Sequence, residues 1–185
     1  MASDYLSKNM KVAIIVYSSE SSQQIANVLK YLNVPYHLYL IDDDGSQDYD
    51  ITHIILSGGP EHVYDKNSAK IPNWVMLSSL PVLGICYGAQ LIAYSFGGSV
   101  TKLKTPELKV MVNITEVIHG QFNRKNVYMN RYDTVTVVPN NFKIIGVGPQ
   151  NDIVNFTDFS RWHGIQYHPE KSGHEDYDVF RRFLK

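Results

Sequence analysis

The segment Pro81–Gln90 constrains the fold of this chain more than any other. It reads Pro-Val-Leu-Gly-Ile-Cys-Tyr-Gly-Ala-Gln, so an apolar run passes directly into Gly-x-Cys-x-Gly and then into a helical pattern. Strand, sharp turn and helix in this order form a nucleophile elbow, whose glycines permit a turn that exposes one side chain above a sheet. The helix N-terminus favours a thiolate there. The pattern therefore predicts that Cys86, the single cysteine, is a nucleophile.

A thiol nucleophile needs a base, and residues 166–170, Gln-Tyr-His-Pro-Glu, offer one. They end an apolar run at 162–167 that is predicted as a strand. The intervening proline fixes the backbone, so the carboxylate of Glu170 can reach back and orient the imidazole of His168. We predict a triad in which the Cys86 thiolate attacks, the imidazole moves the proton and the carboxylate holds the tautomer.

A third element, Leu-Ser-Gly-Gly-Pro at residues 56–60, ends another apolar run. On its own such a sequence is more often a simple turn. Two glycines after a strand also free the backbone to aim N–H groups at a developing oxyanion. We predict that the N–H groups of Gly59 and Tyr87 form an oxyanion hole.

The rest of the chain alternates strand and helix patterns, which predicts an α/β fold with a mostly parallel open sheet and helices on both faces. Residues 99–138 are richer in alternating, β-branched segments and indicate an antiparallel extension. Active sites of such sheets lie at the carboxyl ends of the strands, where the three motifs fall. The predicted strands are 12–17, 35–41, 51–56, the run ending at 85 and a hairpin within 154–167; the predicted helices are 21–32, with serines available as caps, 74–80 and 89–96.

Composition restricts the partners. The net charge is −1 over 185 residues, which offers no electrostatic footprint for nucleic acid or a membrane surface. No apolar run approaches the roughly 18 residues of a membrane span, and Met1–Tyr5 lacks a signal pattern. A single cysteine excludes an internal disulfide and suits a reducing compartment. We expect a cytoplasmic protein with a disordered lead at residues 1–9 and one domain at residues 10–185.

The three motifs, in this order and at these separations, resemble those of the class I (triad) glutamine amidotransferases, whose fold is flavodoxin-like. The resemblance extends from Val12 to Leu184. Residues 55–61, and His-Glu-Asp-Tyr at 174–177, are most similar to the amidotransferase subunit or domain of GMP synthase. The resemblance implies hydrolysis of the glutamine side-chain amide and a separate synthetase of the ATP-pyrophosphatase type that takes up the ammonia. No cofactor or metal is expected on this chain; ATP and Mg²⁺ are expected on the partner.

The same resemblance implies which residues contact L-glutamine. Gln90 lies one helical turn beyond the nucleophile, and residues 128–133 would line the pocket with backbone groups and one carboxylate. That carboxylate, Asp133, would pair with the substrate's ammonium group. The implied substrate-binding residues are Gly58, Gln90, Asn130, Arg131, Tyr132 and Asp133.

Residues 130–133 also depart from the GMP synthase pattern. They read Asn-Arg-Tyr-Asp where those amidotransferases carry a Ser-His-Gly-Asp-like motif, and Arg-Tyr is more similar to the Arg-Tyr-His-Ser of anthranilate and aminodeoxychorismate synthase subunits. Two alternatives stay open: an amidotransferase for another acceptor such as chorismate, and a non-catalytic regulatory homologue. An intact Cys86, His168 and Glu170 argue against the second. The remaining histidines, among them His62, share no ligand spacing and are expected to be ordinary surface or strand residues.

Overall fold

The computed structural model describes residues 10–185, so the lead predicted at residues 1–9 lies outside the described residues. The strands are β1 (Val12–Ile15), β2 (Tyr36–Tyr39), β3 (His53–Leu56), β4 (Val82–Ile85), β5 (Ser99–Ile118), β6 (Gln121–Val137), β7 (Lys143–Val147), β8 (Ile153–Thr157) and β9 (Trp162–Ile165). The helices are α1 (Ser19–Tyr31), α2 (Asn73–Leu77), α3 (Tyr87–Ser95), a 3₁₀ turn η1 (His174–Tyr177) and α4 (Asp178–Phe183).

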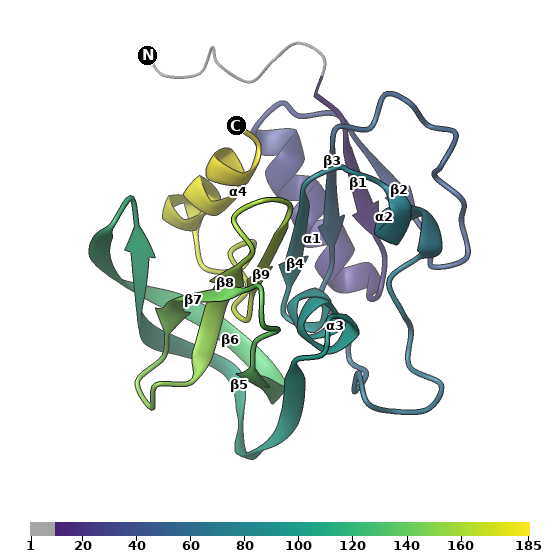
Figure 1. The fold of residues 1–185 in the computed structure, drawn as a ribbon. Helices are drawn as coiled ribbons and strands as arrows, with labels where there is room; N and C mark the ends of the chain where they lie inside the picture. The colour runs from purple at the N-terminus through teal and green to yellow at the C-terminus, as the bar shows by residue number, and fades with distance from the viewer. Residues whose placement is uncertain (1–9) are drawn as a thin grey trace.

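All these strands belong to one sheet, in the order β2-β1-β3-β4-β9-β8-β6-β5-β7 (Figure 1). Neighbours from β2 to β9 are parallel, and the pairs beyond β9 are antiparallel. The parallel part has the flavodoxin-like order, with β9 as its fifth strand. The predicted fold class, a mostly parallel sheet with an antiparallel extension, is confirmed. The sequence pattern does not predict β7, because most of its side chains are exposed and show no apolar run.

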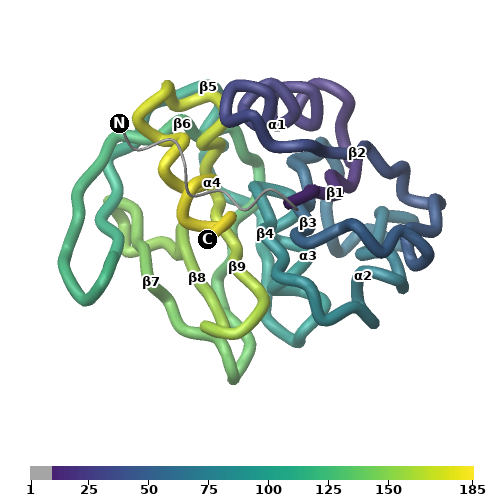
Figure 2. Tube along the Cα trace, turned by 90° about the horizontal axis from the view of Figure 1, so that it is seen from above, coloured from purple at the N-terminus to yellow at the C-terminus, as the bar shows by residue number. Residues whose placement is uncertain are grey.

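Helices cover both faces of the parallel part. Val12 and Ile14 of β1 belong to a core formed with α1 and α4, whereas Ala13 and Ile15 belong to a second core formed with α2 and α3. A strand buried on both faces needs apolar residues at every position, which explains the uninterrupted run in the sequence. Figure 2 shows α1 and α3 on opposite sides of the central strands. Among the described helices, none is long and apolar enough to cross a membrane.

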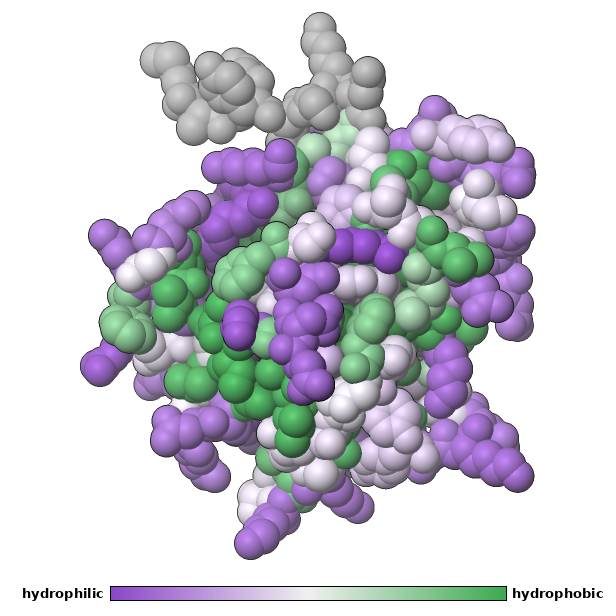
Figure 3. All heavy atoms as spheres, viewed as in Figure 1, coloured by the Kyte–Doolittle hydropathy of each residue, from purple (hydrophilic) through white to green (hydrophobic). Residues whose placement is uncertain are grey.

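The antiparallel part projects to one side of the molecule. β5 and β6 form a long hairpin, and β7 pairs with both β5 and β8, so the four strands close into a ring of pairings. In the space-filling view apolar side chains gather over these strands, while much of the remaining face is polar (Figure 3). Exposed apolar side chains of this part include Val117, Phe122 and Ile144.

Topology brings the three sequence motifs together. β3, β4 and β9 are adjacent and parallel, with Leu56 opposite Gly84 and Ile85 opposite Ile165. The segments that follow these strands therefore leave the sheet at the same edge. The antiparallel strand β6 delivers residues 130–133 to the same place.

Gly88 lies where α3 passes closely over β3. A Cβ atom at this position would lie 2.4 Å from the carbonyl oxygen of Leu56 and 2.7 Å from its Cβ. Since Leu56 is held between two paired strands, neither side can retreat. We expect Gly88→Ala to lower the free energy of unfolding by about 3 kcal/mol and the melting temperature by roughly 6–12 °C. Thermal denaturation measures this shift.

The matched control is Tyr94→Ala, on the half-exposed face of the same helix, where 43% of the side chain is accessible. A surface change of this kind alters stability by about 0.5 kcal/mol or less. Equal melting temperatures for the two variants would contradict the close approach of α3 to β3.

Candidate active site

Cys86 occupies the turn between β4 and α3. Its φ of 51° and ψ of −104° lie in a region that side-chain-bearing residues rarely adopt, at a cost of about 1–3 kcal/mol. The residue is 5% exposed, and its sulfur lies at the N-terminus of α3, where free N–H groups favour negative charge. The Sγ atom is 3.7 Å from the carbonyl oxygen of Asn130. This is the geometry of a nucleophile elbow.

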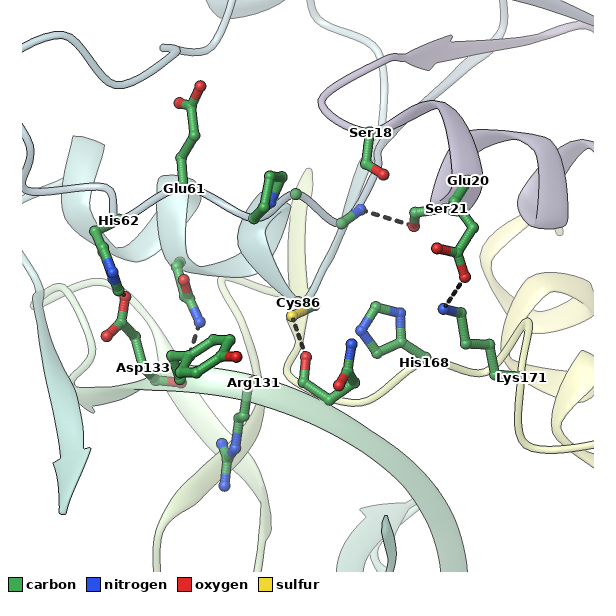
Figure 4. Close-up of a pocket in the computed structure, with 16 residues that line it drawn as sticks. Ser18, Glu20, Ser21, Glu61, His62, Cys86, Arg131, Asp133, His168 and Lys171 are labelled. Atoms are coloured by element: carbon green, nitrogen blue, oxygen red, sulfur yellow. Dashed lines mark hydrogen bonds and ion pairs between the residues drawn. The ribbon is translucent and has the colours of Figure 1, made fainter. Parts of the chain in front are cut away.

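His168 and Glu170 approach the cysteine from beyond β9 (Figure 4). The strand ends at Ile165, so His168 lies in the segment after the sheet rather than at the end of a longer strand as predicted. Its Nδ1 atom is 2.7 Å from Oε1 of Glu170. Its Nε2 atom is buried and has no hydrogen-bond partner within residues 10–185.

The electrostatics of this group favour the imidazolium ion. Burial disfavours the charged ring, but the negative charges of Glu170 and of the Cys86 thiolate outweigh it and hold the pKa of His168 well above its ordinary value. A protonated imidazole beside the cysteine stabilises the thiolate. The arrangement can therefore form a thiolate–imidazolium pair at neutral pH.

The site opens into a cavity of about 210 Å³. All the sequence-predicted site residues line it except Glu170, which lies behind His168, and Tyr87. The lining also includes residues that the sequence did not single out as functional: Ser18, Glu20, Ser21, Pro60, Glu61, His62 and Lys171.

The predicted oxyanion donors come from two elements that meet beside Cys86. Tyr87 is the first residue of α3, and its hydroxyl group donates to Ala69 O at 3.0 Å, so only its main chain is a candidate donor to a ligand. Gly59 packs closely, because a Cβ atom there would lie 3.0 Å from Tyr17 Cβ. The N–H of the preceding Gly58 is already used and donates to Ser21 Oγ at 3.1 Å.

Ser21 joins the glycine loop to the triad. Its Oγ accepts the Gly58 N–H and lies 3.4 Å from Oε1 of Glu170, to which it can donate. A Cβ atom at Gly58 would lie 3.0 Å from both Ser21 Oγ and His168 Cε1. From the sequence Ser21 is only a possible helix cap. Its contact with Glu170 spans 149 residues of chain, and no local pattern signals it.

We expect Ser21→Ala to lower the free energy of unfolding by about 1–3 kcal/mol, because it removes a hydrogen bond to a charged group and strands the Gly58 N–H. The reaction of Cys86 with a glutamine analogue should slow about tenfold, since Glu170 loses one of its two donors. Stopped-time labelling and denaturant titration measure the two effects. The control is Ser22→Ala, because Ser22 bonds only Ser18 O, at 2.7 Å; equal labelling rates for both variants would contradict this role.

Arg131 contributes only its main chain to the cavity. Its guanidinium group is 2% exposed and points away from the cysteine (Figure 4). It forms ion pairs with Glu107, at 2.7 Å, and with Asp152. It also donates to Thr134 Oγ1 at 3.1 Å and Gln166 Oε1 at 3.4 Å. The unusual cation therefore anchors β6 beneath the site and does not block the cavity.

The carboxylate of Asp133 faces the cavity but already has partners. Its Oδ2 atom is 2.5 Å from His62 Nδ1, and its Oδ1 atom accepts the hydroxyl group of Tyr64 at 3.0 Å. Gln90 Nε2 donates to the main-chain carbonyl of Asp133 at 3.1 Å, which fixes this part of β6 against α3. Tyr132 is half exposed at the rim. His62, expected to be an ordinary residue, is thus part of the site.

Comparison with known proteins agrees with this geometry. The family model described as glutamine amidotransferase class-I matches residues 14–185. The GMP synthase (glutamine-hydrolyzing) of Petrotoga mobilis is 36% identical over 185 aligned residues, which cover 95% of this chain and 36% of that protein. The corresponding protein of Glaesserella parasuis is 34% identical over 176 residues, covering 88% and 34%. The chain thus spans about a third of the length of these relatives.

Solved structures give the same result. One of the two subunits of a GMP synthase, from Thermoplasma acidophilum by its description, superposes with a TM-score of 0.84 at 25% identity, covering 95% of this chain and 92% of that one. A glutamine amidotransferase from Thermotoga maritima shares the fold, with a TM-score of 0.76 at 17% identity over 96% and 85% of the two chains. Because the family model covers almost all of the described residues, the chain belongs to the class I glutamine amidotransferase family.

Proposed function

We propose that this protein hydrolyses the side-chain amide of L-glutamine through Cys86, His168 and Glu170, and supplies the ammonia to a separate, GMP synthase-type synthetase. The observation that carries the proposal is the shared cavity of Cys86 and His168, with the imidazole held 2.7 Å from Glu170. Membership of the family and similarity to proteins named GMP synthase support the same reaction.

In this mechanism the Cys86 thiolate attacks the side-chain carbonyl carbon, and the N–H groups of Gly59 and Tyr87 receive the oxyanion. As the carbon–nitrogen bond breaks, His168 gives its proton to the leaving nitrogen and ammonia departs from a thioester. Water then gives a proton to His168 and attacks the thioester carbon. Breaking the carbon–sulfur bond yields glutamate and restores the thiolate.

The α-groups of glutamine would bind at the opposite end of the cavity. Asp133 is the carboxylate that can pair with the ammonium group, and Gly58, Asn130 and Tyr132 line the space between it and the cysteine. We assign Gln90 a supporting role there, because its amide holds the main chain of Asp133.

The ammonia acceptor belongs to the partner in this proposal. The Thermoplasma protein is described as one subunit of its synthase, with nearly the same extent as this chain, which supports a two-chain arrangement. ATP and Mg²⁺ would bind to the synthetase, and both chains would act in the cytoplasm, where thiols stay reduced. Arg131 and Tyr132 keep a chorismate-type acceptor as the second candidate.

The test is to incubate the protein with glutamine, alone and with a GMP synthase-type synthetase, xanthosine monophosphate, ATP and Mg²⁺. Glutamate formation that rises with the synthetase and appears as GMP supports the proposal. Glutamate formation that rises only with a chorismate-using synthase would assign the second acceptor. No glutamate under any of these conditions would favour the non-catalytic homologue.

A further inference from the structure

Two side chains of one loop cover the carboxylate of Asp133. His62 and Tyr64 each reach one carboxylate oxygen, at 2.5 and 3.0 Å. Their rings are stacked, with centroids 5.3 Å apart and an interplanar angle of 14°. Asp133 itself is 2% exposed. A buried carboxylate without donors is costly, so this pair stabilises the site when it holds no ligand.

The loop backbone around His62 is held in place independently of that contact. Val63 is fully buried, and its carbonyl oxygen accepts the Ser68 hydroxyl group at 3.0 Å. Glu61 Oε2 accepts the N–H of Ala69 at 2.8 Å. The His62 side chain, which is 32% exposed, can therefore rotate away from Asp133 without unfolding the loop.

The ammonium group of an amino-acid substrate and His62 require the same carboxylate. Both are donors, and both approach Asp133 from the cavity that contains Cys86. If the empty site spends most of its time with His62 on Asp133, the apparent affinity for glutamine is reduced by the fraction of molecules in which the carboxylate is free.

We propose that His62 is a side-chain latch that competes with the ammonium group of glutamine for Asp133. The inference rests on the proposed function, because it takes Asp133 as the ammonium site. Glutamine binds when His62 rotates out, and its ammonium group replaces the lost donor. The latch sets the affinity for the substrate, and it lies on the loop that also carries Gly59.

The test is calorimetric titration of L-glutamine into the Cys86→Ala protein, which keeps the cavity and cannot turn over. Adding His62→Ala leaves Asp133 with Tyr64 as its remaining side-chain donor, so glutamine should bind about tenfold more tightly. Tyr64→Phe, which removes a neutral donor, should tighten binding by a smaller factor. Asp133→Asn should weaken binding at least tenfold, and His62→Ala should produce no gain when Asp133→Asn is present.

The other outcomes separate the two claims. If Asp133→Asn weakens binding but His62→Ala leaves it unchanged or weaker, His62 only orients the carboxylate, and the latch is wrong while the glutamine site stands. If Asp133→Asn binds glutamine like its parent, the ammonium site lies elsewhere and the latch fails with it. If neither the parent nor the His62→Ala protein binds glutamine, the proposed function itself is contradicted.

Discussion

Replacing Cys86 with alanine should lower the rate of glutamine hydrolysis on the order of 10⁶-fold, because the covalent route disappears with the nucleophile. The Sγ atom is the one group placed at the N-terminus of α3, beside an imidazole with a raised pKa and in front of the cavity. Water placed in the vacated space lacks both the nucleophilicity of a thiolate and its fixed position. The fold should persist, because alanine retains the Cβ atom of the elbow.

The measurement is the intact mass of the protein after exposure to a diazoketone analogue of glutamine. The unmodified chain should gain one adduct, and Cys86→Ala should gain none. This assay needs no synthetase, so it reports on the pocket and the thiol even if turnover depends on a partner. An adduct that persists in the variant would place the nucleophile elsewhere. No adduct on the unmodified chain, with Cys86 still open to a general thiol reagent, would favour partner-gated activation or the regulatory homologue.

Replacing His168 with asparagine should slow hydrolysis by about 10²–10⁴-fold, the usual contribution of a positioned acid–base group. Asparagine can neither protonate the leaving ammonia nor deprotonate water. Alkylation of Cys86 should also slow at neutral pH and rise toward the pH range where ordinary thiols ionise, near 8.5. Comparing the pH–rate profiles of alkylation for the two proteins measures the effect.

The same group makes stability depend on pH. Because the pKa of His168 is raised in the folded state, the imidazolium contributes its full stabilisation below the unfolded value, near 6.5, and loses it as the pH rises through the folded pKa. The stability difference between the unmodified protein and His168→Asn should therefore be largest at about pH 6 and shrink on going alkaline. Denaturant titrations at several pH values test this sign.

The control for both experiments is His119→Asn, at an exposed position whose φ of 49° suits asparagine. It should leave the alkylation profile and the pH dependence of stability unchanged. An identical alkylation profile for His168→Asn would contradict the thiolate–imidazolium pair.

Much of the fold follows from local patterns. Uninterrupted apolar runs mark strands buried on both faces, and Gly-x-Cys-x-Gly marks the turn between β4 and α3. Adjacent parallel strands end at one edge of the sheet, so the motifs after Leu56, Ile85 and Ile165 had to converge. The placement of Cys86 beside His168 could therefore be predicted without coordinates, because it depends on chain direction and turn chemistry.

The contacts around these residues depend on tertiary structure. The same arginine at 131 could have entered the cavity, but the register of β5 against β6 places it opposite Glu107, and the pair buries the guanidinium beneath the site. Ser21 reaches Glu170 across 149 residues, and His62 reaches Asp133 across 71. Turn signals and apolar periodicity describe near neighbours in the chain, whereas these contacts depend on how separate elements pack. Local residue patterns thus specify the nucleophile and the parallel sheet that presents it, while the packing of distant segments selects the side chains that support the triad and those that cover the Asp133 carboxylate.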